Sequence, residues 1–138
     1  MNKDNEQILL SVIVPCFNEI KTLGKVINNI QSSPVGSKEI IIVDDFSSDG
    51  SREFLKNVES RNITTIFHDE NLGKGAALCS GISLAKGKIV IIQDADLEYD
   101  PNQFPDIIEP IVNGKADVVY GSRFQGGQPH RVVYFWHR

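Results

Sequence analysis

Three acidic residues alternate along the chain just after one of its most apolar runs. Asp94, Asp96 and Glu98 follow the run 89–92. In extended backbone alternate side chains share a face, so these carboxylates are expected to point the same way. They repel one another unless a cation compensates, and their oxygens suit Mg²⁺ or Mn²⁺, whose shell a substrate diphosphate can complete. Loop acids or helix N-caps ahead of Pro101 are the competing interpretation, because a D-x-D motif alone is a weak signal.

A further carboxylate and a lysine add to this chemistry. Asp45 follows the apolar run 40–43 and precedes a turn, where it could accept a nucleobase N–H, hold a ribose hydroxyl, or bond its own backbone. Lys74 lies in the segment 71–75 (NLGKG), which lacks the phosphate-loop pattern and is first of all a helix entry. A second interpretation places Lys74 near phosphates, so it is included among the nucleotide-binding candidates.

The end of the chain is basic, although the whole is acidic with a net charge of −4. Cations beside an acidic metal site suit phosphate-bearing substrates, and a solvated helix face is the alternative. The three histidines are not spaced as a metal cluster, so each is expected to be a surface or packing residue. The basic residues and histidines in question are His68, Arg123, His130, Arg131, His137 and Arg138.

Apolar periodicity predicts the elements that must position these residues. Strands are expected at 9–14, 39–43, 63–67, 88–92 and 117–120, and helices at 20–30, around 54–58, 73–85 and 101–112. This alternation favours an α/β layer with a mostly parallel sheet, buried on both faces. Such sheets bind ligands at the carboxyl ends of their strands, which is where the polar candidates fall.

Length and composition set the outer bounds. The 138 residues suit one domain, and with 41% hydrophobic and 23% charged residues the chain resembles an ordinary globular protein. Its negative charge argues against a nucleic-acid partner. No apolar run approaches the length of about 20 residues that a membrane span needs. A polar start and only two cysteines predict a cytoplasmic protein without a disulfide framework or signal peptide.

Several motifs occur together in one order: residues 12–19 (VIVPCFNE), 41–50 (IIVDDFSSDG), 71–75 (NLGKG), 94–96 (DAD) and 121–123 (GSR). This ordered set resembles the family-2 inverting glycosyltransferases with the GT-A fold. Within them it is most similar to dolichyl- or polyprenyl-phosphate hexose synthases. The resemblance implies a three-layer, Rossmann-like single domain over 1–138, incomplete at its C-terminus. Its nucleotide-binding portion would cover 8–124, and an acceptor-side segment would begin at 125–138.

The resemblance also implies substrates and roles. A hexose would pass, with inversion and with Mg²⁺ or Mn²⁺, from GDP-mannose or UDP-glucose to a polyprenyl phosphate at the inner face of the membrane. The expected nucleotide-binding residues are Pro15, Phe17, Glu19, Asp45, Asp94 and Ala95. The metal is expected on Asp94, Asp96 and Glu98, although the family often has Gln at the position of Glu98. Arg123 and Arg138 would meet donor or acceptor phosphates, and the catalytic set would be Asp94, Asp96 and Arg123.

Length is where the chain departs from that family, whose catalytic domains usually run further. Residues 132–136 look like the opening of a helix cut off from its partners. We therefore expect a fragment that binds nucleotide with weak or absent transfer, and whose aromatic residues 134–136 favour self-association.

Two other functions compete with this interpretation. A receiver-like signalling domain would use Asp44, Asp45 and Asp94. However, its acid pair belongs after the first strand, and no lysine follows Lys115 as that class requires. A non-catalytic nucleotide-binding module is the second rival.

Overall fold

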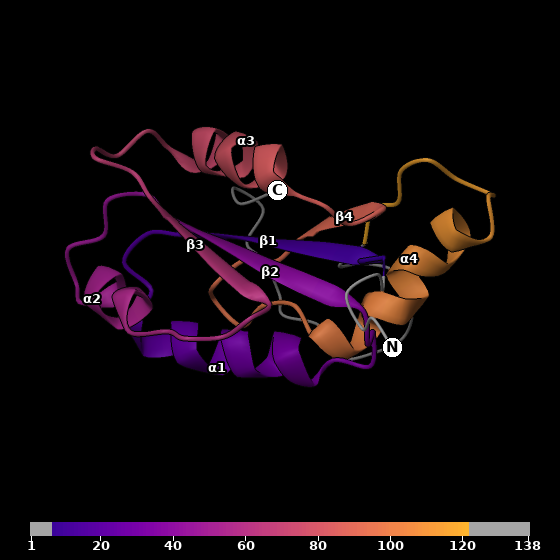
Figure 1. Cartoon of the computed structure of the whole chain (residues 1–138), viewed down its shortest axis with the longest axis horizontal. Helices are drawn as coiled ribbons and strands as arrows, with labels where there is room; N and C mark the ends of the chain where they lie inside the picture. Colours follow the sequence, from indigo (N-terminus) through magenta and orange to yellow (C-terminus); the bar gives the residue numbers. More distant parts are fainter. Residues whose placement is uncertain (1–6, 122–138) are drawn as a thin grey trace, which may run out of the picture.

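The computed structural model describes residues 7–121, which form a central sheet with helices on both faces (Figure 1). The strands are β1 (Leu10–Cys16), β2 (Lys38–Asp44), β3 (Ile63–Phe67) and β4 (Ile89–Ile92). They pair in parallel in the order β3-β2-β1-β4. Helices α1 (Ile20–Ser32), α2 (Ser51–Lys56) and α3 (Lys74–Leu84) connect them, and a 3₁₀ turn η1 (Pro101–Gln103) and α4 (Phe104–Val112) follow β4. The predicted α/β fold is confirmed.

Helices pack on both faces of the sheet and bury the apolar side chains of β1 and β2 on each face. The expected burial on both faces does not extend to β4, where Val90 and Ile92 are 40% and 48% exposed. One face of β1 and β2 packs against α1, α2 and α4, through residues that include Leu23, Ile30, Leu55, Phe104 and Ile108. The opposite face, with Ile13, Ile41 and Val43, packs under Ala77 of α3. Helix α3 comes close to β1 because residue 81 is glycine. A Cβ there would lie 2.6 Å from Ile13 Cγ2.

Strand β1 runs through Pro15 to Cys16, although the sequence predicted a strand over 9–14 only. In β1 the backbone N–H and C=O groups of the odd-numbered residues point toward β4. The last hydrogen bond between the two strands joins the Gln93 N–H to the Ile13 carbonyl at 2.9 Å. The backbone nitrogen of Pro15 points to the same side, but Pro15 lies beyond the end of β4 at Ile92. Its missing N–H therefore costs no ladder bond. The strand order reverses at β1, and its end is consequently where the fold offers space to a ligand.

The fifth strand predicted at 117–120 is not formed. Residues 117–119 lie beside β4 and α4 around a small apolar hollow, but no strand is assigned to them, and Val118 and Tyr120 are 64% and 89% exposed. An apolar stretch becomes a strand only where a neighbour completes its backbone hydrogen bonds, which periodicity alone does not reveal.

The strand order also bears on the receiver-like alternative. Receiver-like folds have the order 2-1-3-4-5, with the third strand beside the first. Here β1 lies between β2 and β4, so that alternative is wrong.

Candidate functional site

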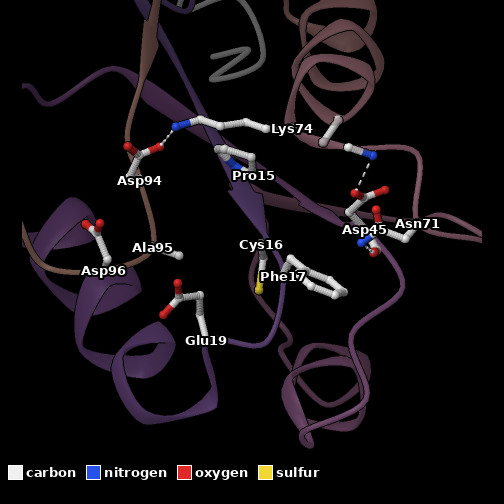
Figure 2. Close-up of a pocket in the computed structure, with 12 residues that line it drawn as sticks. Pro15, Cys16, Phe17, Glu19, Asp45, Asn71, Lys74, Asp94, Ala95 and Asp96 are labelled. Atoms are coloured by element: carbon white, nitrogen blue, oxygen red, sulfur yellow. Dashed lines mark hydrogen bonds and ion pairs between the residues drawn. The ribbon is translucent and has the colours of Figure 1, made fainter. Parts of the chain in front are cut away.

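A cavity of about 380 Å³ opens at the carboxyl ends of β1, β2 and β4. Figure 2 shows two groups of side chains in it. The Asp94 end consists of Glu19, Lys74, Asp94, Ala95 and Asp96, and the Asp45 end consists of Asp45, Asn71 and Gly73. Phe17 and Cys16 lie between them. The cavity thus brings together eight predicted site residues: Pro15, Phe17, Glu19, Asp45, Lys74, Asp94, Ala95 and Asp96.

Hydrogen bonds join the loop after β1 to the segment after β2. The backbone N–H groups of residues 18, 19 and 20 donate to Ser47 Oγ, Ser51 Oγ and Asp49 Oδ2, at 2.9, 3.0 and 3.0 Å. These side chains thus satisfy N–H groups at the start of α1, which has no side-chain cap of its own. Burial raises the pKa of Asp49, but hydrogen bonds from residue 20 and Ser51 lower it more, so that it lies below its ordinary value. The fastened loops hold Phe17 and Glu19 at the cavity.

At the Asp45 end, one carboxylate gathers three donors. Asp45 Oδ1 accepts the Leu72 N–H at 2.9 Å and lies 2.8 Å from His68 Nδ1, and Oδ2 accepts the Gly73 N–H at 2.8 Å. Asp45 is only 3% exposed. Burial raises its pKa, but the bonds from His68, Leu72 and Gly73 lower it more, so the net pKa lies below the ordinary value. Asp45 therefore stays ionised at neutral pH and fixes the loop that leads into α3.

His68 has a role that sequence reasoning missed. It was expected to be a surface or packing residue. It is buried, but both ring nitrogens are also hydrogen-bonded, Nδ1 to the site carboxylate of Asp45 and Nε2 to Ser80 Oγ at 2.9 Å. Arg52 also contacts this residue. Its Nη1 donates to the His68 carbonyl at 2.8 Å and pairs with Asp44. The only sequence signal was its position directly after β3, at the edge where ligands bind.

At the Asp94 end, the expected extended backbone is not formed. Strand β4 ends at Ile92, the chain turns at 95–96, and Leu97 has a φ of 65°. The alternation that was predicted to align three carboxylates is therefore lost. Asp96 Oδ1 instead accepts the Glu98 N–H at 3.0 Å, and Glu98 is exposed and does not line the cavity.

One carboxylate of this end, Asp94, pairs with a lysine. Lys74, the first residue of α3, places Nζ 2.6 Å from Asp94 Oδ1. Within residues 7–121 no cluster of three or more His, Cys, Asp or Glu side chains is close enough to hold a metal by itself. The oxygens of Glu19, Asp94 and Asp96 nevertheless lie around one cavity. That donor set fits an ion such as Mg²⁺, which takes one or two carboxylates and completes its shell with water and phosphate.

Cys16 also lines the cavity, but it is not a nucleophile at neutral pH. Burial, and next the nearby charge of Asp44, raise the pKa of its thiol to about 11. The thiolate is the reactive form, so covalent chemistry at this residue is disfavoured.

Two expectations fall outside the described residues. Arg123 and Arg138 lie there, and so does the aromatic segment 134–136. In the described part of the chain, no helix has the length and apolar character to span a membrane.

Comparison with known proteins confirms the family. Residues 11–134 match the model of glycosyl transferase family 2, so the chain belongs to this family. The dolichol-phosphate mannosyltransferase of Pyrococcus furiosus is 33% identical over 129 residues, which cover 91% of this chain and 36% of that protein. The chain spans about a third to a half of the length of the curated relatives it matches.

Solved structures agree with the fold. The mannosyltransferase PcManGT from Pyrobaculum calidifontis, in complex with GDP-Man and Mn²⁺, has a TM-score of 0.58 and 30% identity, and the match covers 67% of this chain and 28% of that one. S. aureus TarS residues 1–349, solved with UDP, has a TM-score of 0.71 at 21% identity, over 86% of this chain and 40% of that one, which shows a shared fold.

Proposed function

We propose that this chain forms the donor side of a glycosyltransferase that moves a hexose from a nucleotide sugar to a polyprenyl phosphate. One observation carries the proposal. A single cavity at the strand ends has a fixed carboxylate at its Asp45 end and a set of carboxylates with a lysine at its Asp94 end. A nucleoside diphosphate sugar has matching ends, namely a base with N–H donors and a charged diphosphate.

The base and the diphosphate would take opposite ends of the cavity. Asp45 would accept an N–H of the base, and the exposed ring of Phe17, 49% accessible, would offer an apolar surface beside it. Lys74 would meet the diphosphate, helped by the partial positive charge at the start of α3. Pro15 would line the space between these two ends, and Ala95 would line the end that takes the diphosphate.

A divalent ion, Mg²⁺ or Mn²⁺, would be held by Asp94 and Asp96. PcManGT, which is 30% identical, was solved with Mn²⁺ and GDP-Man, and this supports a metal here. The ion would neutralise the charge that develops on the departing nucleoside diphosphate. Lys74 would release Asp94 for this purpose, because the lysine is exposed and water weakens the pair. Glu98, outside the cavity, is the weaker ligand candidate.

The acceptor is proposed from the relatives, one of which is a dolichol-phosphate mannosyltransferase. A phosphate acceptor is already an anion and needs positioning rather than a general base, which suits a cavity whose carboxylates serve other roles. Arg123 and Arg138 are proposed to guide its charge, and such a lipid acceptor would place the protein at the inner face of the membrane.

Calorimetric titration tests the donor site. The 138-residue chain is titrated with UDP, GDP and their hexose derivatives, with and without Mn²⁺. Asp96→Asn is expected to weaken the Mn²⁺-dependent part of the binding about tenfold or more, because it removes an anionic ligand. The matched control is Asp106→Asn on α4, which lies outside the cavity.

The outcomes separate clearly. Metal-dependent binding that survives Asp96→Asn unchanged would remove this residue from the site. Failure of both UDP and GDP to bind at millimolar concentration would overturn the donor-binding proposal as a whole.

A further inference from the structure

Three side chains from three separate segments form a hydrogen-bonded row beside the cavity. Ser80 on α3 lies 2.9 Å from His68 Nε2, and His68 Nδ1 lies 2.8 Å from Asp45 Oδ1. His68 and Asp45 are 8% and 3% exposed, so solvent hardly reaches the bond between them. Ser80 is half-buried. Rotation of either buried side chain would leave a buried polar atom unpaired, so the bond between His68 and Asp45 keeps its geometry.

The direction of each bond follows from Asp45. Its carboxylate accepts backbone N–H groups from Leu72 and Gly73, and an ionised carboxylate accepts only. His68 Nδ1 must therefore donate. In the neutral imidazole Nε2 is then an acceptor, and the Ser80 hydroxyl donates to it. Asp45 thereby selects this tautomer, and the bond between Ser80 and Nε2 holds the other side of the ring.

The same count shows what Asp45 has left to offer. A carboxylate has about four acceptor positions. Oδ1 uses two, on His68 and Leu72, and Oδ2 uses one, on Gly73. One position on Oδ2 remains, and Asp45 lines the cavity. Asp45 Oδ2 can therefore accept one hydrogen bond from a ligand, and the three existing bonds fix the orientation of this carboxylate.

We propose that His68, backed by Ser80, is a positioning residue for the donor nucleotide, because it holds Asp45 in the orientation that accepts a ring N–H of the base. The inference rests on the proposed function and assigns roles to two residues outside the cavity lining. The base class it names carries a protonated ring nitrogen, as uracil does at N3 and guanine at N1. Affinity for the base is therefore expected to depend on a residue that never touches it.

Two substitutions at one position separate positioning from packing. His68→Asn keeps an amide N–H near the place of Nδ1, and His68→Gln places its amide near Nε2 instead. Titration uses the better-binding of UDP and GDP, with Mn²⁺. His68→Gln is expected to weaken binding about tenfold, as the loss of one bond to a charged group implies, whereas His68→Asn stays within about threefold of the parent. Ser80→Ala is expected to cost about threefold, because His68 loses the bond at Nε2 that helps to hold its ring in place.

Two control ligands give readouts that a purely structural role would not produce. The first is the same nucleotide methylated on its ring nitrogen, which lacks the N–H that Asp45 would accept, so His68→Gln should change its affinity less than about twofold. The second is Mn²⁺ with inorganic pyrophosphate, whose binding should be equal in all variants.

The proposal is overturned if His68→Asn and His68→Gln lose affinity equally, if the methylated nucleotide loses as much as its parent, or if pyrophosphate binding falls in parallel. If His68→Gln does not fold, Ser80→Ala decides, and parental affinity in that variant overturns the proposal. Tight nucleotide binding that ignores all three substitutions leaves the donor site standing and removes only this inference.

Discussion

The two ends of the cavity hold their carboxylates in different ways. At the Asp45 end the acid is buried and bonded to His68, Leu72 and Gly73. At the Asp94 end Asp96 is exposed and accepts one backbone N–H, from Glu98, among the described residues. The carboxylate of the Asp45 end is already held in place without a ligand, whereas Asp96 at the other end has few bonds that fix its orientation. A base needs a fixed partner for a directional bond, while a metal and a diphosphate need ligands that can adjust.

The largest expected difference between the ends is in stability. Asp45→Ala leaves two backbone N–H groups and His68 without their buried acceptor, so the free energy of unfolding should fall by about 3 kcal/mol. Asp96→Ala should change it by less than about 0.5 kcal/mol, as is usual for an exposed residue. Urea unfolding measures both variants. Equal losses would show that the two ends are not built differently.

A smaller effect is expected where the loops after β1 and β2 are joined. Asp49→Ala removes the acceptor of the Ile20 N–H at the start of α1 and should cost about 1 kcal/mol, the usual contribution of a helix cap. The loss should also weaken nucleotide binding, because the same loop carries Phe17. Ser48→Ala is the control, since its bond to Asn18 uses only the Ser48 backbone N–H. Comparable losses in the two variants would contradict the assignment to Asp49.

Lowering the pH should reduce the free energy of unfolding through protonation of Asp45. The folded pKa of Asp45 is below its ordinary value, so below a pH of about 4 the unfolded chain binds a proton that the folded chain does not. The stabilisation is thus complete above the unfolded pKa and is lost as the pH falls through the folded pKa. Unfolding measured between pH 5 and pH 3 should show a steeper fall for the parent chain than for Asp45→Asn. Parallel curves would exclude this coupling.

The smallest stability change is expected at Lys74. The lysine is exposed and water weakens its pair with Asp94, so Lys74→Gln should alter the free energy of unfolding by less than about 0.5 kcal/mol. The same substitution should weaken diphosphate binding severalfold, because one cation is lost near the phosphates. Thermal unfolding and titration with Mn²⁺ and pyrophosphate measure the two effects. A large loss of stability with unchanged binding would make this lysine structural.

Much of this arrangement was predictable from local patterns. Continuous runs of Ile and Val indicated β2 and β4, and the helical spacing of Leu23, Val26 and Ile30 indicated α1, because burial requires these periods wherever the chain folds. The carboxylates that follow the strands could also be placed, since parallel strands end at one edge.

Other features depended on neighbours that the local pattern does not contain. Residues 117–120 are apolar enough for a strand but have no partner ladder. The acidic alternation at 94–98 was expected to be extended, but the chain turns there. His68 looked like an ordinary histidine until β2, β3 and α3 brought Asp45 and Ser80 to its two ring nitrogens.

By itself the order of residues determined the class of fold and the chemical types gathered at its edge, because hydrophobic period and strand polarity are local properties. Only the tertiary structure decided which carboxylate is fixed and which is free. That division depends on which N–H groups and side chains the folded chain brings within hydrogen-bond distance of each acid, and those donors come from segments that are far apart in the sequence.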